Sequence, residues 1–181
     1  LYDQIPLVHE LVEAFGMPIY VKERYEADDV IGSITTKLKG QNSKVKSIIV
    51  TGDMDLLQLV DDGIVEVYLL RKGLSDFELY DEAKVEERFG FGPKYIVDYK
   101  ALRGDASDNI PGVPGIGEKT AKELIAKVGG VDEIYSELKT QPSSRAQVER
   151  NSPKRPVALG ALLAKFKTSV VKRLEDGKES A

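Results

Sequence analysis

The chain contains, at residues 101–121, the stretch ALRGDASDNIPGVPGIGEKTA. Its first half leaves a helical pattern and enters a loop of turn-forming residues that includes Asp105 and Asp108. Its second half is a Gly-Ile-Gly turn at 115–117, which opens a strong helical pattern from Glu118 onward. Strand signals occur only before this stretch, so it marks a change from one type of structure to another.

Upstream of this stretch, helical patterns alternate with short apolar runs. The helical patterns cover 4–15, 28–38, 56–60, 82–89 and 94–102, and the strand-like runs cover 19–21, 47–51 and 65–70. This alternation predicts an α/β layer with a mostly parallel sheet flanked by helices. Downstream, helical patterns at 118–128, 131–138 and 157–174 predict an all-helical subdomain. We place the boundary at Gly104, which divides the chain into an α/β core, 1–104, and a helical subdomain, 105–181.

Three groups of acidic residues lie at the ends of these predicted elements. They are Glu26, Asp28 and Asp29 at a helix start, Asp53 and Asp55 after a strand, and Asp105 and Asp108 in the loop. Each group alone also fits helix capping or turn formation. Three groups on one edge of a sheet would repel one another unless cations neutralise them. Their oxygen ligands favour Mg²⁺ or Mn²⁺.

Two other interpretations use the same acids. A calcium-binding EF-hand loop is excluded by Leu57 and by the missing central glycine. A magnesium-dependent aspartyl phosphatase could use Asp53 and Asp55, with the Asp105 loop as its magnesium motif. That hypothesis leaves the first acidic group and the helical end unexplained, and leucines stand where a hydroxyl residue is expected after Asp55.

The glycine turn favours a phosphate-binding role. Gly115 and Gly117 allow close backbone approach, and the free N–H groups and dipole of the following helix attract an anion. Lys119, Thr120 and Lys122 follow within that helix. The turn is not a P-loop, because a residue separates the glycine from the lysine. It is typical of helix-hairpin-helix elements that hold a DNA backbone without reading sequence, although a plain turn between two helices is the alternative.

The composition limits which side chains can carry out a reaction. The 181 residues include no cysteine and one histidine, His9, in an ordinary amphipathic pattern, so thiol chemistry is excluded and chemistry must depend mainly on carboxylates, lysines and metals. The formal net charge is −4, but residues 139–173 hold nine Lys or Arg and one Glu, a net +8. A basic end beside an acidic body suits a protein that holds a polyanion and metal ions. No apolar run approaches the roughly 20 residues of a membrane helix.

Together these motifs resemble the 5′-nuclease (5′-3′ exonuclease and flap endonuclease) domain of bacterial DNA polymerase I. The resemblance rests on YEADDVI at 25–31, TGDMDLLQL at 51–59 and the 101–121 stretch, in that order. It runs from Gln4 to about Leu138 and resumes near Val170. It implies a PIN-like core with a helix-hairpin-helix subdomain, and hydrolysis of DNA and RNA-primer phosphodiesters during replication and repair.

The resemblance also implies roles for individual residues. Two Mg²⁺ or Mn²⁺ ions, roughly 4 Å apart, would activate water and stabilise the leaving 3′ oxygen. The ligands would be the seven acids named above, direct or through water. The backbone grip would come from Gly115, Gly117, Lys119, Thr120 and Lys122, with a monovalent cation such as K⁺ at the hairpin. Implied partners are 5′-flap or nicked duplex DNA, RNA primer on DNA, and a polymerase domain on the same parent chain, with no membrane.

Two departures from the family pattern affect what we expect. Family members begin with a strand that carries a metal-binding aspartate, followed by a basic arch, and Leu1 and Ala181 suggest cuts through a longer protein. We therefore expect this chain alone to show little cleavage, and a DNA-binding module without catalysis is the alternative. The second departure is a basic insertion at 142–167. The expected compartment is the bacterial cytoplasm at the nucleoid, with an organelle left open.

Overall fold

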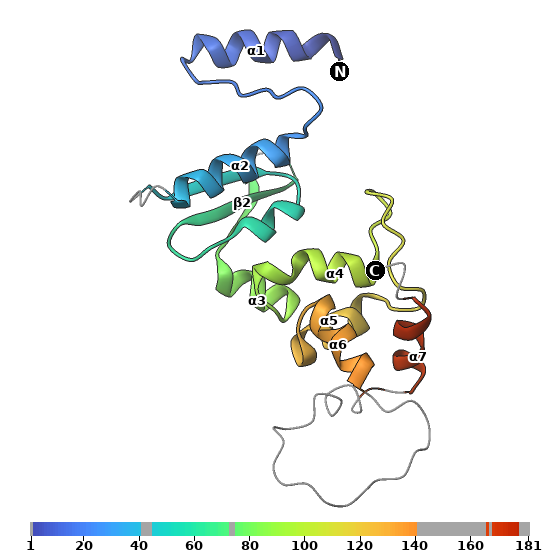
Figure 1. Cartoon of the computed structure of the whole chain (residues 1–181). Helices are drawn as coiled ribbons and strands as arrows, with labels where there is room; N and C mark the ends of the chain where they lie inside the picture. Colours follow the sequence, from blue (N-terminus) through green and yellow to red (C-terminus); the bar gives the residue numbers. More distant parts are fainter. Residues whose placement is uncertain (1, 41–44, 73–74, 141–165, 167, 178–181) are drawn as a thin grey trace, which may run out of the picture.

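The computed structural model describes residues 2–40, 45–72, 75–140, 166 and 168–177. Figure 1 shows an elongated arrangement of three parts along the chain. Helix α1 (Ile5–Ala14), preceded by the short turn η1 (Tyr2–Gln4), lies at one end. The sheet and helix α2 (Ala27–Gly40) lie in the middle, and the remaining helices form the other end.

The sheet has three strands in the order β1-β2-β3. Strand β1 (Ser47–Thr51) pairs in parallel with β2 (Val65–Lys72), which pairs antiparallel with β3 (Asp76–Tyr80). The α/β class is confirmed, but the sheet is mixed rather than mostly parallel. Strand β3 was not predicted because its apolar residues Phe77 and Leu79 are exposed, so their alternation does not mark a core-facing side.

The strand predicted at 19–21 was wrong. These residues belong to no strand among the described residues, and Tyr20 and Val21 are exposed. A strand exists only when its backbone groups pair with a neighbour, and the described sheet consists of β1, β2 and β3 alone. An apolar pattern therefore misled the prediction, because it does not show whether another strand pairs with the segment.

The predicted helices in the described regions are confirmed. The elements are η2 (Asp55–Leu59), α3 (Glu82–Phe89), η3 (Pro93–Tyr95), α4 (Ile96–Arg103), α5 (Glu118–Val128), α6 (Val131–Thr140) and α7 (Thr168–Asp176). Asp81 caps α3, since its carboxylate accepts a hydrogen bond of 2.7 Å from the Lys84 backbone N–H. The predicted helix at 157–174 lies largely outside the described residues, and only its end coincides with α7.

One hydrophobic core joins the sheet to the helices. Val65 and Val67 of β2, Leu102 of α4 and Leu124 of α5 are fully buried members of the same cluster. Burial of one such side chain stabilises the fold by about 1.5–3 kcal/mol. The helical end is therefore joined to the sheet through η2, which contacts both β2 and α4, and this packing determines where the loop after α4 lies.

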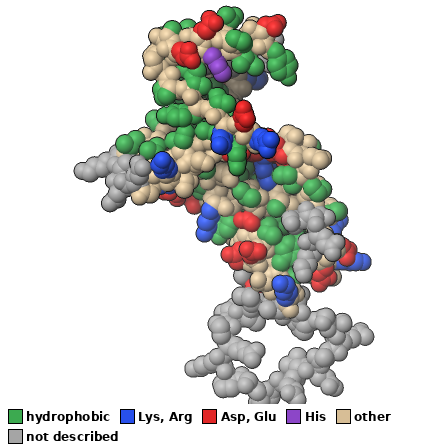
Figure 2. Space-filling model, turned by 45° about the horizontal axis from the view of Figure 1, so that its top comes forward, with side chains coloured by type: hydrophobic (Ala, Val, Ile, Leu, Met, Phe, Trp, Pro, Cys, Tyr) green, Lys and Arg blue, Asp and Glu red, His purple; other side chains and the backbone are tan. Residues whose placement is uncertain are grey.

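Helix α1 contributes no buried residue. Its apolar side chains Ile5, Leu7, Val8 and Leu11 are all exposed, and Figure 2 shows hydrophobic side chains gathered over this end of the molecule. Among the described residues, no helix has both the length and the apolar character required to cross a membrane. The apolar face of α1 is thus a surface feature of this chain.

Candidate metal centre and DNA-backbone hairpin

The loop after α4 is closed by backbone hydrogen bonds. Asp105 and Ile110 exchange two backbone N–H···O bonds of 2.9 and 2.8 Å, and the Val113 N–H donates to the Leu102 carbonyl at 2.9 Å. Gly112 has φ 66°, and a Cβ there would lie 2.3 Å from the backbone nitrogen of Gly104. This close approach admits only glycine, and it brings the two ends of the acidic loop together.

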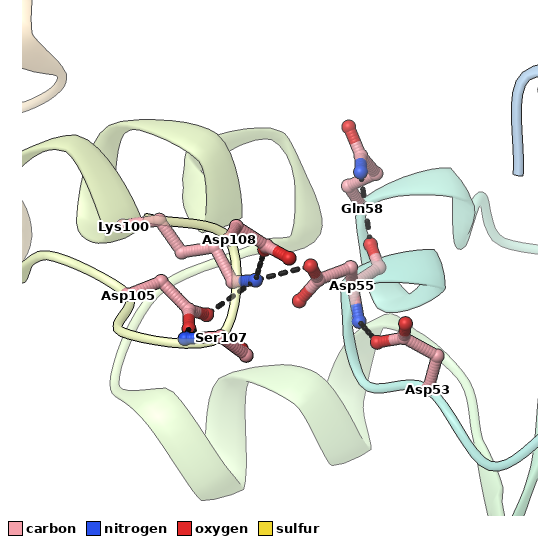
Figure 3. Close-up of polar contacts among 7 residues, drawn as sticks. All are labelled: Asp53, Asp55, Gln58, Lys100, Asp105, Ser107 and Asp108. Atoms are coloured by element: carbon pink, nitrogen blue, oxygen red, sulfur yellow. Dashed lines mark hydrogen bonds and ion pairs between the residues drawn. The ribbon is translucent and has the colours of Figure 1, made fainter. Parts of the chain in front are cut away.

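Three predicted acids meet at this loop. Asp55, at the start of η2, lies beside Asp105 and Asp108, and one carboxylate oxygen from each lies within 4.8 Å of the others. Two of the three predicted acidic groups are therefore brought together by the packing of η2 against α4 (Figure 3). Three carboxylates at this spacing are a suitable set of hard oxygen ligands for a divalent cation.

Lys100 lies at the centre of this group. Its Nζ is 2.7 Å from an oxygen of Asp105 and 3.1 Å from an oxygen of Asp108, and it also contacts the Asp55 carboxylate. Figure 3 shows the ammonium pointing between the three carboxylates. The side chain comes from the last turn of α4 and is only 17% exposed. The positive charge neutralises part of the repulsion among the acids.

The electrostatic environment shifts the pKa values of these groups. Burial raises the pKa of Asp55, although the Lys100 hydrogen bond opposes the shift. Hydrogen bonds from Lys100, and then from the hydroxyl and backbone N–H of Ser107, hold the pKa of Asp105 well below its usual range. Burial opposes the charge on Lys100, but its hydrogen bonds to the three carboxylates raise its pKa above the usual value. The ion pairs of Lys100 thus link the charges of this group.

The turn before η2 orients Asp55. The Asp53 backbone N–H donates to the Thr51 hydroxyl and the Asp55 backbone N–H donates to the Asp53 carboxylate, each at 2.9 Å. The Gln58 amide donates to the Asp55 carbonyl at 3.0 Å. Asp53 is thus outside the group around Lys100. It supports the turn that carries Asp55 and places a second carboxylate beside that residue.

The first acidic group approaches from α2. Burial first, and then repulsion by the carboxylates of Asp53, Glu26, Asp29 and Asp108, raise the pKa of Asp28. Asp28 is therefore electrostatically coupled to the other two groups. The Asp29 carboxylate instead accepts a 3.0 Å hydrogen bond from the Glu26 backbone N–H and so caps α2. The structure thus does not bring Glu26 and Asp29 into the group around Lys100.

The glycine turn lies between this loop and α5. Val113 and Ile116 are buried and anchor the turn, while Gly115 and Gly117 are exposed. Gly117 is the N-cap residue of α5, and no side chain caps this helix start. The first N–H groups of α5 can therefore bind an anion. Helices α4 and α5 pack against each other on either side of the loop and turn.

The basic residues of this region differ in availability. Lys119 is exposed and has no ion-pair partner among the described residues. The Lys122 ammonium is occupied, since it lies 2.8 Å from the Glu118 carboxylate and 5.4 Å from the centre of the Phe89 ring. Thr120 is half-buried in the first turn of α5. Of the predicted lysines, Lys119 is the one free to meet a phosphate.

Two residues of the site were missed by sequence reasoning. Lys100 is the cation among the acids, and its signal was its position one helical turn before the Gly-Asp loop. Arg173 of α7 donates from Nη1 to the Gly115 carbonyl at 2.8 Å, and nothing in the local sequence indicated that contact. The net +8 segment at 139–173 and the basic insertion lie almost entirely outside the described residues.

Solved structures share this architecture. T5 5′-exonuclease with divalent metal ions (zinc) bound superposes with a TM-score of 0.64 at 22% identity, covering 95% of this chain and 56% of that protein. The catalytic core of Rad2 in complex with DNA substrate gives a TM-score of 0.57 at 22% identity, with coverages of 98% and 50%. The chain thus shares the fold of these two proteins.

Sequence comparison defines the family. Residues 1–90 match the 5′-3′ exonuclease N-terminal resolvase-like domain, and residues 91–178 match the 5′-3′ exonuclease C-terminal SAM fold. The chain belongs to the 5′-3′ exonuclease family. It is 44% identical to DNA polymerase I of Bacillus caldotenax over 138 residues and 45% identical to that of Caldicellulosiruptor bescii over 151 residues. These matches cover 76% and 82% of this chain but only 15% and 18% of the relatives.

Proposed function

We propose that the protein is a metal-dependent, structure-specific 5′-3′ exonuclease and flap endonuclease that hydrolyses phosphodiester bonds in DNA and RNA primers. The observation that carries this proposal is the convergence of Asp55, Asp105 and Asp108 on a loop that continues directly into the Gly115–Gly117 turn. A cation site and an anion-binding helix start therefore lie on one rigid stretch, as cleavage of a nucleic-acid backbone requires.

The donor set fits divalent metal ions. We assign Asp55, Asp105 and Asp108 as the principal ligands, with Asp28 and Asp53 beside them and Glu26 and Asp29 acting from the start of α2. Two Mg²⁺ or Mn²⁺ ions would supply a nucleophile from water and stabilise the leaving oxygen. The chain's own part is to hold the carboxylates in place, through the Asp53 turn and the closed Asp105 loop.

The hairpin, formed by the Gly115–Gly117 turn and the start of α5, holds the DNA. The N–H groups at the start of α5 and the exposed Lys119 would bind a duplex phosphate, with Gly115 and Gly117 allowing its close approach. A K⁺ ion at the turn, and contributions from Thr120 and Lys122, belong to the same proposal. Lys122 would first have to leave Glu118. Contacts of this kind recognise backbone rather than sequence.

The relatives, which are DNA polymerases, support a proposal for the wider setting. We propose substrates with a 5′ flap or a nick, or an RNA primer on DNA, and a polymerase domain on the same parent chain, in the cytoplasm at the bacterial nucleoid. The division into an α/β core and a helical subdomain at Gly104 remains a prediction. A DNA-binding module without catalysis is the second candidate, because the hairpin contacts do not depend on the carboxylates.

The test is cleavage of a 5′-labelled flap substrate with Mg²⁺ by the natural protein in which this chain occurs. Asp55→Asn and Asp105→Asn should each lower the cleavage rate by at least about a hundredfold, because each removes a charged ligand. Asp76→Asn is the matched control, since Asp76 is an exposed carboxylate on β3 that is not part of the group of three acids. Lys119→Ala should weaken DNA binding instead. Unchanged DNA binding with no cleavage by the natural protein would support the binding-module alternative.

A further inference from the structure

The position of Lys100 raises a question that the proposed metal site alone does not answer. Its ammonium lies within ion-pair distance of Asp55, Asp105 and Asp108, the same three residues whose oxygens lie within 4.8 Å of one another. A cation bound by those oxygens and an ammonium at this point would occupy the same space. They would also repel each other as like charges.

The surroundings of Lys100 offer a second position that its side chain can occupy. A cavity of about 270 Å³ adjoins Lys100. Two of the acids, Asp55 and Asp108, line it together with Gln58, and its remaining wall is apolar, formed by Ile96, Val97, Ala101 and Ile110. A lysine side chain has a flexible apolar stem with a compact charge at its tip. The stem can shift along these apolar walls, so the ammonium can leave the carboxylates without disturbing the backbone of α4.

The loop also needs a cation when no metal is present. The closed loop holds the backbone that carries Asp105 and Asp108, and the Asp53 turn holds the backbone of Asp55, so the three carboxylates are kept near one another. An internal ammonium limits their mutual repulsion. The chain contains other lysines in this region, such as Lys94, whose ammonium lies over the Tyr95 ring at 4.6 Å rather than against an acid.

We propose that Lys100 is an internal substitute for the metal: its ammonium holds the three carboxylates together in the metal-free protein and is displaced when a divalent cation binds. Lys100 is a positioning residue in this scheme, because it sets the metal affinity of the carboxylates and prevents the acidic loop from opening. The inference rests on the proposed metal site.

The first experiment is Mn²⁺ binding, measured by calorimetry at fixed ionic strength on the wild type, K100M and K94M. Removal of the internal competitor should tighten Mn²⁺ binding by K100M about tenfold and should lower its metal-free melting temperature. K94M should match the wild type. Equal or weaker Mn²⁺ binding by K100M overturns the proposal. No Mn²⁺ binding by any of the three proteins would overturn the metal site itself, and this inference with it.

A second measurement tests the proposal on the wild-type protein and does not depend on whether K100M folds. The wild-type protein is treated with a water-soluble amine-acylating reagent, with and without saturating Mg²⁺, and acylation of Lys100 is quantified by mass spectrometry relative to Lys94. Displacement from the carboxylates exposes a side chain that is 17% exposed in the metal-free protein, so acylation should be several-fold faster with Mg²⁺. An unchanged or slower rate would show that Lys100 stays among the acids.

Discussion

At the scale of single residues, Gly112 is the position where one added methyl group should have the largest effect on the acidic loop. A Cβ at Gly112 would lie 2.3 Å from the Gly104 nitrogen and 2.6 Å from the Arg103 carbonyl carbon, both backbone atoms that cannot move aside. Gly112→Ala should therefore lower the free energy of unfolding by about 2–4 kcal/mol, as measured by urea denaturation.

Gly117→Ala is the control for that substitution. Gly117 has φ −93°, and nothing lies within 4 Å of the position of its Cβ. Its effect should stay below about 1 kcal/mol, the range expected for loss of a glycine N-cap without a clash. Equal destabilisation by the two substitutions would show that the close approach at Gly112 does not constrain the fold.

The raised pKa values of Asp28 and Asp55 predict how metal binding depends on pH. A raised pKa means that the folded, metal-free protein holds a proton more tightly than the unfolded chain. That contribution to stability is present below the unfolded pKa of 3.8 and is lost as pH rises through the folded value. Asp105 acts oppositely, because its pKa is lowered: its contribution is present above 3.8 and is lost on acidification.

Mg²⁺ binds the ionised forms of Asp28 and Asp55, and the raised pKa of each carboxyl makes protons stronger competitors at these positions. The increase in melting temperature caused by Mg²⁺ should therefore be small at about pH 5 and larger at about pH 7.5. Differential scanning calorimetry with and without Mg²⁺ at both pH values measures this, with Asp55→Asn as the variant in which the response should shrink. A response independent of pH would contradict the involvement of these two carboxylates.

The residues of the site were only partly predictable from sequence. Seven acids in three groups were predicted to share one site, because acids at strand ends and in turns leave a visible pattern, and the structure brings Asp55, Asp105 and Asp108 of them together. Lys100 was not predicted as part of the site, since the helix dipole alone also favours a lysine in the last turn of a helix. The signal that would distinguish the two roles is three-dimensional, because it depends on the side of α4 that meets η2.

At the scale of elements, α7 stabilises the glycine turn. Arg173 donates to the Gly115 carbonyl at 2.8 Å, and Gly115, with φ 79°, leaves no room for a Cβ, which would lie 2.8 Å from the Arg173 Nε. Leu174 of the same helix is fully buried in the core. The helix is thus anchored on one side, and its arginine is held against the turn that we assign to the DNA backbone.

Arg173→Ala should weaken duplex DNA binding about fivefold more than Lys172→Ala. Each substitution removes one positive charge from α7, and the charge-dependent loss should therefore be similar. Only Arg173 is bonded to the turn, so the difference reports the support of Gly115. Fluorescence anisotropy on several unrelated duplexes at two salt concentrations measures it. Equal losses would indicate that Arg173 contributes charge alone.

Helices and strands were predictable where the apolar face of the sequence pattern is also the face that is buried in the structure. The α5 pattern gave the helix from Glu118 to Val128 because its apolar face is the face that is buried. The pattern failed at 19–21 and at β3, where apolar side chains are exposed and a strand depends on its neighbour. Backbone pairing between distant segments is not encoded in the periodicity of either one.

At the scale of the whole molecule, α1 should contribute little to stability. Because it has no buried residue, deletion of residues 1–16 should change the melting temperature by less than about 2 °C. Leu174→Ala, at a fully buried position in the core, should lower it by more than about 5 °C. Calorimetry on both variants measures this. A decrease for the deletion as large as that for Leu174→Ala would show that α1 packs on the rest of the protein.

The closed loop after α4 also has a consequence for the length of the reaction products. Only 13 residues run from Asp105 to Gly117, and the paired backbone bonds of Asp105 and Ile110, with the bond from Val113 to the Leu102 carbonyl, hold the path between them. In a nuclease built this way, the phosphate held at the turn and the phosphate being cut lie at a constant separation along the strand. Under the proposed function, the position of the cut would then be set by the folded path of this loop, without reading a single base.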